Sequence, residues 1–143
     1  MQLIVPSGVV TASGTGPAGN FVSHTEVITS AIYILDVTAA ASAAGDLLNV
    51  YVQHSWDDGV SWDDFISFTQ VLGNGGAKKF LAFWSLYGTA PSTPMKAPQD
   101  AALTAGNVQQ GPVGNTLRAK WAVVNGGGSH SFTFSVGIQQ VEG

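Results

Sequence analysis

The sequence predicts an all-β fold: a single antiparallel β-sandwich or jelly roll of seven or eight strands with long loops. Several segments alternate between apolar and polar residues with a period of two, which is typical of half-buried strands. Clusters of glycine separate these segments, and no stretch has the apolar period of an amphipathic helix. The 143 residues are enough for one domain with its own core.

The N-terminal residues have a composition that cannot form a core of its own. Residues 7–20 are mostly Gly, Ser, Thr and Ala, so we expect residues 1–20 to be an extended arm and residues 21–143 to form the sandwich domain. The short apolar strip Leu3, Ile4 and Val5 could add a strand to the sheet of a neighbouring subunit. The alternatives are a frayed terminus or the first strand of the chain itself.

The first half of the sandwich domain contains the patterns of several strands. Residues 27–28 and 31–38 are rich in β-branched and aromatic residues, and the alanine-rich stretch 39–46 that follows is expected to be a loop. Residues 47–54 alternate strictly between apolar and other residues, which predicts a half-buried strand. A further strand is expected within 62–71, and the glycine-rich turn after it leads to a strand at 78–87.

The second half contains one long loop and two further strands. Residues 88–115 carry four prolines and several glycines, so we expect an irregular loop with a short helical turn near 99–103. Residues 116–125 and 131–141 both alternate, and the glycines between them predict that the two strands pair as a hairpin.

Residues 55–62 read Ser-Trp-Asp-Asp-Gly-Val-Ser-Trp and resemble the Asp-box, a turn found in sialidases and other β proteins. Its defining positions are Ser55, Asp57, Gly59 and Trp62. The serine and aspartate side chains bind backbone amides, the glycine supplies a positive φ, and the tryptophan packs beneath. Sialidases repeat the box and use several arginines, whereas this chain has one box and one arginine. We therefore interpret the motif as a structural turn.

Nothing in the sequence indicates catalysis, a cofactor or a metal site, so we expect a protein that is not an enzyme. Acidic residues cluster around the Asp-box at positions 57, 58, 63 and 64, but a calcium site needs converging oxygen ligands. Alternation sends Asp63 and Asp64 to opposite faces of a strand, so a solvated acidic turn is expected. The three histidines lie in no metal-binding or catalytic motif, and the chain has no cysteine.

The charge pattern bears on the class of partner. The net charge is −4 and only 10% of residues are charged, so we expect no nucleic-acid partner, because phosphate binding needs a basic patch. No signal peptide or run of about 20 apolar residues is present, which predicts a protein made in the cytoplasm without a membrane partner. A surface with few ions suits burial in an assembly, because few charges must be desolvated.

The strand expected at 78–87 is apolar on both faces. Phe80, Ala82 and Trp84 share one face, and Leu81 and Phe83 share the other. One face packs on the core, and the other needs a second cover, which could be a partner subunit or the 88–115 loop. A platform for a sugar is a further alternative. The candidate partner contacts are Leu3, Ile4, Val5, Phe80, Phe83, Trp84 and Tyr87.

The central and C-terminal segments resemble the head decoration, or cement, proteins of tailed phages, which have a jelly-roll β-sandwich. The matching segments are 35–38, 48–55, 58–62, 65–70, 117–121 and 132–136. The resemblance implies a non-enzymatic virion protein on the outer capsid surface that stabilises the capsid by bridging neighbouring capsomers. Its partners would be the major capsid protein and further copies of itself, as a homodimer or homotrimer. A tail or head-fibre module and a carbohydrate-binding module are the alternatives.

Overall fold

The fold consists of strands and contains no helix among the described residues, which confirms the all-β prediction. The computed structural model describes residues 1–20, 28–41, 43–88, 95–114, 116–128 and 130–141. The strands are β1 (Gln2–Val10), β2 (Gly14–Thr15), β3 (Ser30–Ala39), β4 (Leu47–Ser55), β5 (Asp63–Ser67), β6 (Val71–Leu72), β7 (Lys78–Ser85), β8 (Asn107–Val108), β9 (Thr116–Val124) and β10 (Phe132–Val141). The prediction named seven or eight strands; β2, β6 and β8 have only two residues each, too few to show a period.

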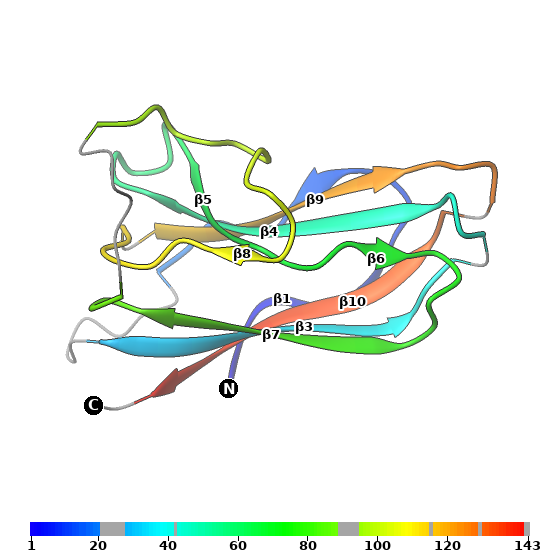
Figure 1. Ribbon diagram of the computed structural model, residues 1–143, viewed down its shortest axis with the longest axis horizontal. Coiled ribbons are helices and arrows are strands. Elements are labelled where there is room, and N and C mark those ends of the chain that lie inside the picture. Colours follow the sequence, from blue (N-terminus) through cyan, green and yellow to red (C-terminus); the bar gives the residue numbers. More distant parts are fainter. Residues whose placement is uncertain (21–27, 42, 89–94, 115, 129, 142–143) are drawn as a thin grey trace.

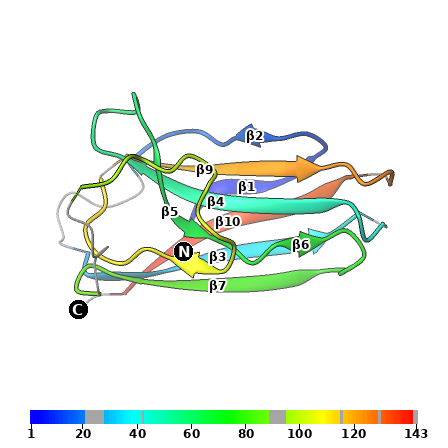
Figure 2. The same cartoon turned by 45° about the horizontal axis from the view of Figure 1, so that its top comes forward.

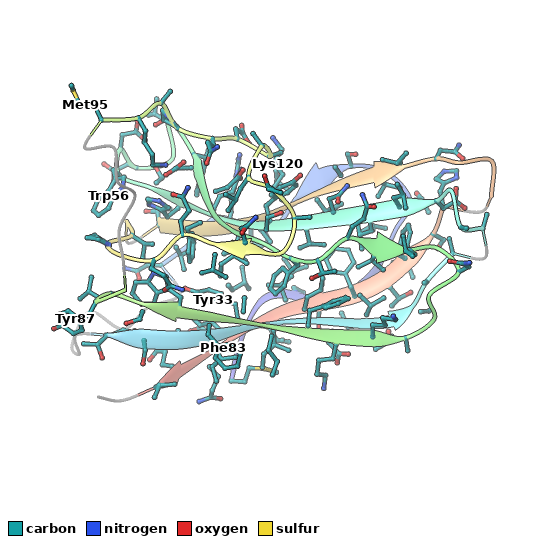
Figure 3. All side chains as sticks on the ribbon, in the orientation of Figure 1. Tyr33, Trp56, Phe83, Tyr87, Met95 and Lys120 are labelled. Atoms are coloured by element: carbon teal, nitrogen blue, oxygen red, sulfur yellow. The ribbon has the colours of Figure 1, made fainter. Side chains whose placement is uncertain are left out.

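The strands form two antiparallel sheets that lie in two layers (Figure 1). The four-stranded sheet has the order β1-β10-β3-β7, and the six-stranded sheet runs β2-β9-β4-β5-β8 with β6 beside β4. The core lies between the layers and joins side chains of both sheets. Tyr33 of β3 meets Phe65 of β5 edge to face, with ring centroids 5.4 Å apart. Figure 3 shows Tyr33 between the two layers.

The alternation seen in the sequence corresponds to the buried faces of the long strands. Leu48, Val50 and Val52 of β4 are fully buried, and Phe132 and Phe134 begin the same inward row on β10. Each of these strands has one face on the core, as the period of two predicts. The strand predicted at 78–87 is also confirmed, and β7 ends at Ser85.

The N-terminal segment differs from the predicted arm, because it pairs within the chain. β1 pairs with β10 and β2 pairs with β9, so residues 1–20 contribute one strand to each sheet. Ile4 and Val5 are buried in the core, which makes Leu3–Val5 part of the chain's own first strand. This pairing requires small residues, and the same small residues made the segment look like an unpaired arm in the sequence. A Cβ at Gly14 would stand only 3.2 Å from the Trp121 ring.

The predicted hairpin of the last two strands is wrong. β9 and β10 lie in different sheets, so the glycine-rich connection between them crosses from one layer to the other. The carboxylate of Asp46 accepts hydrogen bonds from the amides of Gly126 at 2.7 Å, Gly128 at 3.3 Å and His130 at 3.2 Å. Burial raises the pKa of Asp46, but these amides outweigh it and the pKa is lowered. Two alternating strands separated by glycines have the same sequence pattern whether they form a hairpin or cross between sheets. The residue that holds the crossing, Asp46, lies 80 positions before Gly126 in the sequence.

Candidate interaction surface

The outer face of the four-stranded sheet carries large apolar side chains that remain exposed. Leu81 and Phe83 of β7 are 53% and 62% exposed. Figure 3 shows Phe83 pointing away from the six-stranded sheet. Their cross-strand neighbours on β3 are Ile34 and Ile32, which are half-buried. Neighbouring apolar side chains on adjacent strands therefore join into one continuous patch.

The patch continues across the sheet to the first strand. Ile34 lies opposite Gly137 of β10, and Gly137 lies opposite Leu3 of β1, which is 45% exposed. Gly137 leaves room for the side chain of Met1, whose sulfur would stand 2.8 Å from a Cβ built at that glycine. The outer apolar face is defined by Met1, Leu3, Ile32, Ile34, Leu81 and Phe83.

At the border of the outer apolar face lies a pair of charged groups. Asp36 and Lys79 are cross-strand neighbours with side chains 40% and 61% exposed, and their charged atoms are 3.9 Å apart. An exposed pair of this kind contributes about 0–1 kcal/mol to stability. The face is therefore apolar inside a polar border, which is the usual arrangement of a protein–protein contact.

The predicted partner contacts separate into surface and core. Ile4, Val5 and Trp84 are buried within the chain, so they do not contact a partner of the folded protein. The Trp84 Nε1–H donates to the Gly111 carbonyl at 3.0 Å, which explains how an indole can face the core. Phe80 is half-buried against the core. The exposed members are Leu3, Phe83 and Tyr87. The outer apolar face also includes Ile32 and Ile34, which are brought beside Leu81 and Phe83 by the register between β3 and β7. Alternation within the sequence already placed Leu81 on the same face as Phe83.

The outer side of the six-stranded sheet is polar and is covered by the chain itself. The fully buried Gln53 of β4 donates to Asp64 and to Asp100, at 2.7 Å each, and accepts from the Arg118 Nε–H at 2.8 Å. Lys120 donates to the same Asp100 oxygen at 2.8 Å. We call Gln53, Asp64, Asp100, Arg118 and Lys120 the loop-anchoring cluster, because they tie the segment around Asp100 to β4, β5 and β9.

Asp64 is the centre of the loop-anchoring cluster and corrects two predictions. Its carboxylate accepts from the successive amides of Ala101, Ala102 and Leu103 at 3.0, 2.8 and 3.0 Å. Residues 99–103 form no helical turn, and Ala101 has a φ of +55°, which lies outside the right-handed helical region. Asp64 is fully buried, so the predicted solvated acidic turn does not include it.

The neighbouring Asp63 anchors the start of the same loop and contacts a buried histidine. Its carboxylate accepts from Lys96 Nζ at 2.5 Å and from the Gln99 amide at 2.8 Å, and its side chain is only 14% exposed. His54 Nε2 lies 3.4 Å from Asp63, while His54 Nδ1 accepts from the Gly114 amide at 2.9 Å. Since Nδ1 accepts, the proton sits on Nε2 and the ring is neutral. Burial lowers the pKa of His54 although the Asp63 charge raises it.

The Asp-box residues use their polar groups within the turn. Ser55 Oγ accepts from the Gly59 amide and donates to Asp57, both at 2.8 Å. Asp57 also accepts from the Ser61 hydroxyl at 2.6 Å and the Ser61 amide at 2.8 Å, which lower its pKa to about 2. Gly59 adopts a φ of +87°. These bonds are what a structural turn requires, and they engage both carboxylate oxygens of Asp57 within the turn.

Trp62 closes the Asp-box against the loop-anchoring cluster. The Arg118 guanidinium lies 4.3 Å from the centroid of its ring, within the range of a cation–π contact. A Cβ at Gly59 would stand 3.3 Å from the same ring, so the indole packs directly against the turn. The lone arginine is thus held by a stacking contact and by Gln53.

The metal-ligating side chains in the described part of the chain do not gather into a group of ligands. No group of three or more His, Cys, Asp or Glu residues there could hold a metal ion. No helix in those residues is long and apolar enough to cross a membrane.

Comparison of the chain with protein-family models, with curated proteins and with solved structures gives no match. Function therefore has to be inferred from the geometry.

Proposed function

We propose that the chain is a non-enzymatic structural protein of a tailed-phage virion. In this role it binds the outer surface of the assembled capsid and stabilises it by bridging neighbouring capsomers. The observation that carries the proposal is the outer apolar face, with Leu81 and Phe83 more than half exposed. Contiguous apolar patches of this kind mark contacts with other molecules.

A jelly-roll topology, which the resemblance to decoration proteins implies, is supported by the strand pairing. β1 pairs with β10, β2 with β9, β3 with β7 and β4 with β5. Apart from β6 and β8, which lie in the connections, the first strand thus pairs with the last and the second with the second to last. That nested order is what a long hairpin gives when it is rolled into two layers.

The energetics of the outer apolar face fit a capsid-binding role. Burying a large apolar side chain contributes about 1.5–3 kcal/mol. A protein that binds the assembled lattice and not the free subunits stabilises the lattice by mass action. The polar groups of the opposite sheet are already used by the loop-anchoring cluster, so the apolar face is the better candidate for such a contact.

Co-sedimentation with undecorated phage heads tests the proposal. The wild-type chain should pellet with the heads at micromolar concentration, and Phe83→Lys should weaken binding about tenfold or more. Val124→Lys is the matched control, because Val124 is 45% exposed but belongs to β9 of the six-stranded sheet. The capsid role is contradicted when the wild-type chain stays in the supernatant, and the assigned surface is contradicted when both variants bind equally well.

A tail or head-fibre module would use the same outer apolar face and would bind those parts in place of heads. A carbohydrate-binding module is a different candidate and rests on another observation. Trp56 and Met95 are 67% and 84% exposed beside a cleft of about 520 Å³ that His54 and Asp63 also line. Sugar binding would quench the Trp56 fluorescence, and Trp56→Ala would abolish binding while leaving co-sedimentation unchanged.

A further inference from the structure

β7 lies at the edge of the four-stranded sheet, and its one partner among the described strands is β3 (Figure 2). The side chain of Gln110 shows which backbone groups face away from β3. Its Oε1 accepts from the Ser85 amide at 2.6 Å, and its Nε2 donates to the Phe83 carbonyl at 2.9 Å. Because N–H and C=O groups of one residue point to the same side and alternate along a strand, Lys79 and Leu81 also face the open edge.

Among the described residues, the open edge is capped at its end. Gln110 occupies the place of a paired peptide group beside Phe83 and Ser85, whereas no described strand pairs with β7 beside Leu81 and Lys79. Hollows of about 390 and 200 Å³ follow this edge, and Phe80 lines both. An unpaired row of N–H and C=O groups of this kind is a template for another strand.

We propose that β7 pairs with β7 of a second copy of the chain, antiparallel across a two-fold axis at Leu81. This inference rests on the proposed function, because it names the second copy as one of the partners. The two Leu81 residues would exchange backbone hydrogen bonds with each other, and Lys79 of each copy would lie opposite Phe83 of the other.

Charge favours this register over one centred on the lysines, and the Gln110 cap on Phe83 and Ser85 disfavours one centred on Phe83. β7 begins with Lys78 and Lys79, which would meet their own counterparts in a register centred on them, at a cost from like charges. Centred on Leu81, the two Lys79 residues lie about four strand positions apart, roughly 14 Å. That exceeds the Debye length of about 8 Å at physiological salt, so their repulsion is screened. Lys79 instead packs on the Phe83 ring of the other copy.

Continuity of the apolar surface supports the same partner. Leu81 and Phe83 point to the outer side of β7, together with Ile32 and Ile34 of β3. Pairing across β7 would join the outer apolar faces of both copies into one larger face. A dimer would thus present a doubled surface to a third protein, and two weak contacts would bind with added avidity.

Disulfide trapping tests the register, because the wild-type chain has no cysteine. Cα atoms in a hydrogen-bonded antiparallel pair are about 5.5 Å apart, which a disulfide can span. Under mild oxidation, Leu81→Cys should form a covalent dimer in high yield. Val9→Cys is the matched control, because Val9 is 65% exposed on the other edge strand of the same sheet. A mixture of Lys79→Cys with Phe83→Cys should give the mixed dimer, and equal trapping of Val9→Cys would overturn the proposal.

Backbone variants separate strand pairing from side-chain contact. Leu81→Pro removes the N–H that faces the open edge and spares those that bind β3, so it should weaken dimerisation about tenfold more than Leu81→Ala. Gln110→Ala uncovers the end of the edge and should strengthen dimerisation. Sedimentation velocity measures both, and circular dichroism checks the fold. If Leu81→Pro does not fold, Gln110→Ala and the trapping experiment still decide.

The outcomes for self-pairing and for the proposed function are distinguishable. A wild-type chain that stays monomeric from micromolar to millimolar concentration overturns the β7 pairing, even when it binds heads. A chain that dimerises through β7 but does not co-sediment with heads supports the pairing and contradicts the capsid role.

Discussion

The two sheets of this protein treat their outer sides in opposite ways. The six-stranded sheet presents polar side chains outward around Gln53 and Asp64, and residues 95–103 of the same chain cover that part. The four-stranded sheet presents Leu81, Phe83 and their neighbours, and these stay exposed. A loop without an apolar run of its own can be held only by directed polar contacts. The face of Leu81 and Phe83 offers no such contacts, and it is the face that we propose for a partner.

The contrast lies in the kind of bond that each side can make. Asp64 collects three backbone amides and the Gln53 side chain, so the covering loop has its polar groups satisfied. The ion pair that the described residues place at the border of the outer apolar face is the exposed Asp36–Lys79 pair. Variants of the two sides should therefore differ in what they change: stability on the covered side and binding on the exposed side.

The largest effect is expected at the centre of the covered side. Asp64→Ala leaves the amides of residues 101–103 and Gln53 without their acceptor, and should lower the free energy of unfolding by about 3 kcal/mol. Urea denaturation measures it. Asp58→Asn is the control, because Asp58 is exposed, asparagine tolerates its φ of +57°, and stability should change by less than about 0.5 kcal/mol. Similar small changes in the free energy of unfolding of both variants would contradict the claim that Asp64 holds the covering loop.

A smaller effect should follow from pH through His54 on the covered side. Burial holds its pKa below the usual value, despite the Asp63 charge, and Lys96 lowers it further. As pH falls below about 6.5, the unfolded chain therefore takes up this proton first, and stability is lost by at most about 1.4 kcal/mol per pH unit until the folded pKa is reached. Above that window His54 contributes no pH dependence.

Thermal melts between pH 7.5 and 5 measure this contribution. His54→Asn has no titrating group at that position, so its stability should depend less steeply on pH than that of the wild-type chain. Parallel curves for the two proteins would contradict the assignment.

A still smaller effect is expected where the covered side meets solvent. Lys120 donates to Asp100 at 2.8 Å, but the side chains are 30% and 50% exposed. Lys120→Ala should therefore cost about 0.5 kcal/mol, and added salt should reduce that difference. Chemical denaturation at low and high salt checks both statements, and a loss above about 2 kcal/mol would show that the surface pair matters more than its exposure implies.

The smallest effect on stability is expected on the exposed side. Phe83→Ser removes an apolar side chain that is 62% exposed, so stability should change by less than about 0.5 kcal/mol. Binding to heads should nevertheless fall, because the ring is buried only in the complex. Thermal melts measure the stability of the variant, and co-sedimentation measures its binding. A variant that is strongly destabilised but binds as well as the wild-type chain would contradict the claim that this side serves binding and not stability.

The long strands were predicted well because the alternation within each strand indicates which of its two faces is buried. Leu48, Val50 and Val52 alternate within one strand, and the same applies to Phe132 and Phe134 of β10. Pairing between distant strands was not readable. The same two strands and glycines fit a hairpin as well as a crossing, and Asp46 decides between them from far along the chain.

The candidate surface was predictable only in part for the same reason. Alternation placed Leu81 with Phe83 on one face of their strand, but Ile32 and Ile34 join them only through the register of β3 and β7. Trp84 is aromatic and close to Phe83 in sequence, yet it faces the core. Asp64 read as part of an acidic turn because its partners lie 37 to 39 positions away.

Hydrogen exchange on the wild-type chain, alone and bound to undecorated heads, would show whether the outer apolar face is the interface. We expect added protection of the amides of Leu81 and Phe83, with no change at residues 101–103, which Asp64 already protects. Added protection confined to the six-stranded sheet and its covering loop, with β7 unchanged, would contradict the claim that the outer apolar face is the interface.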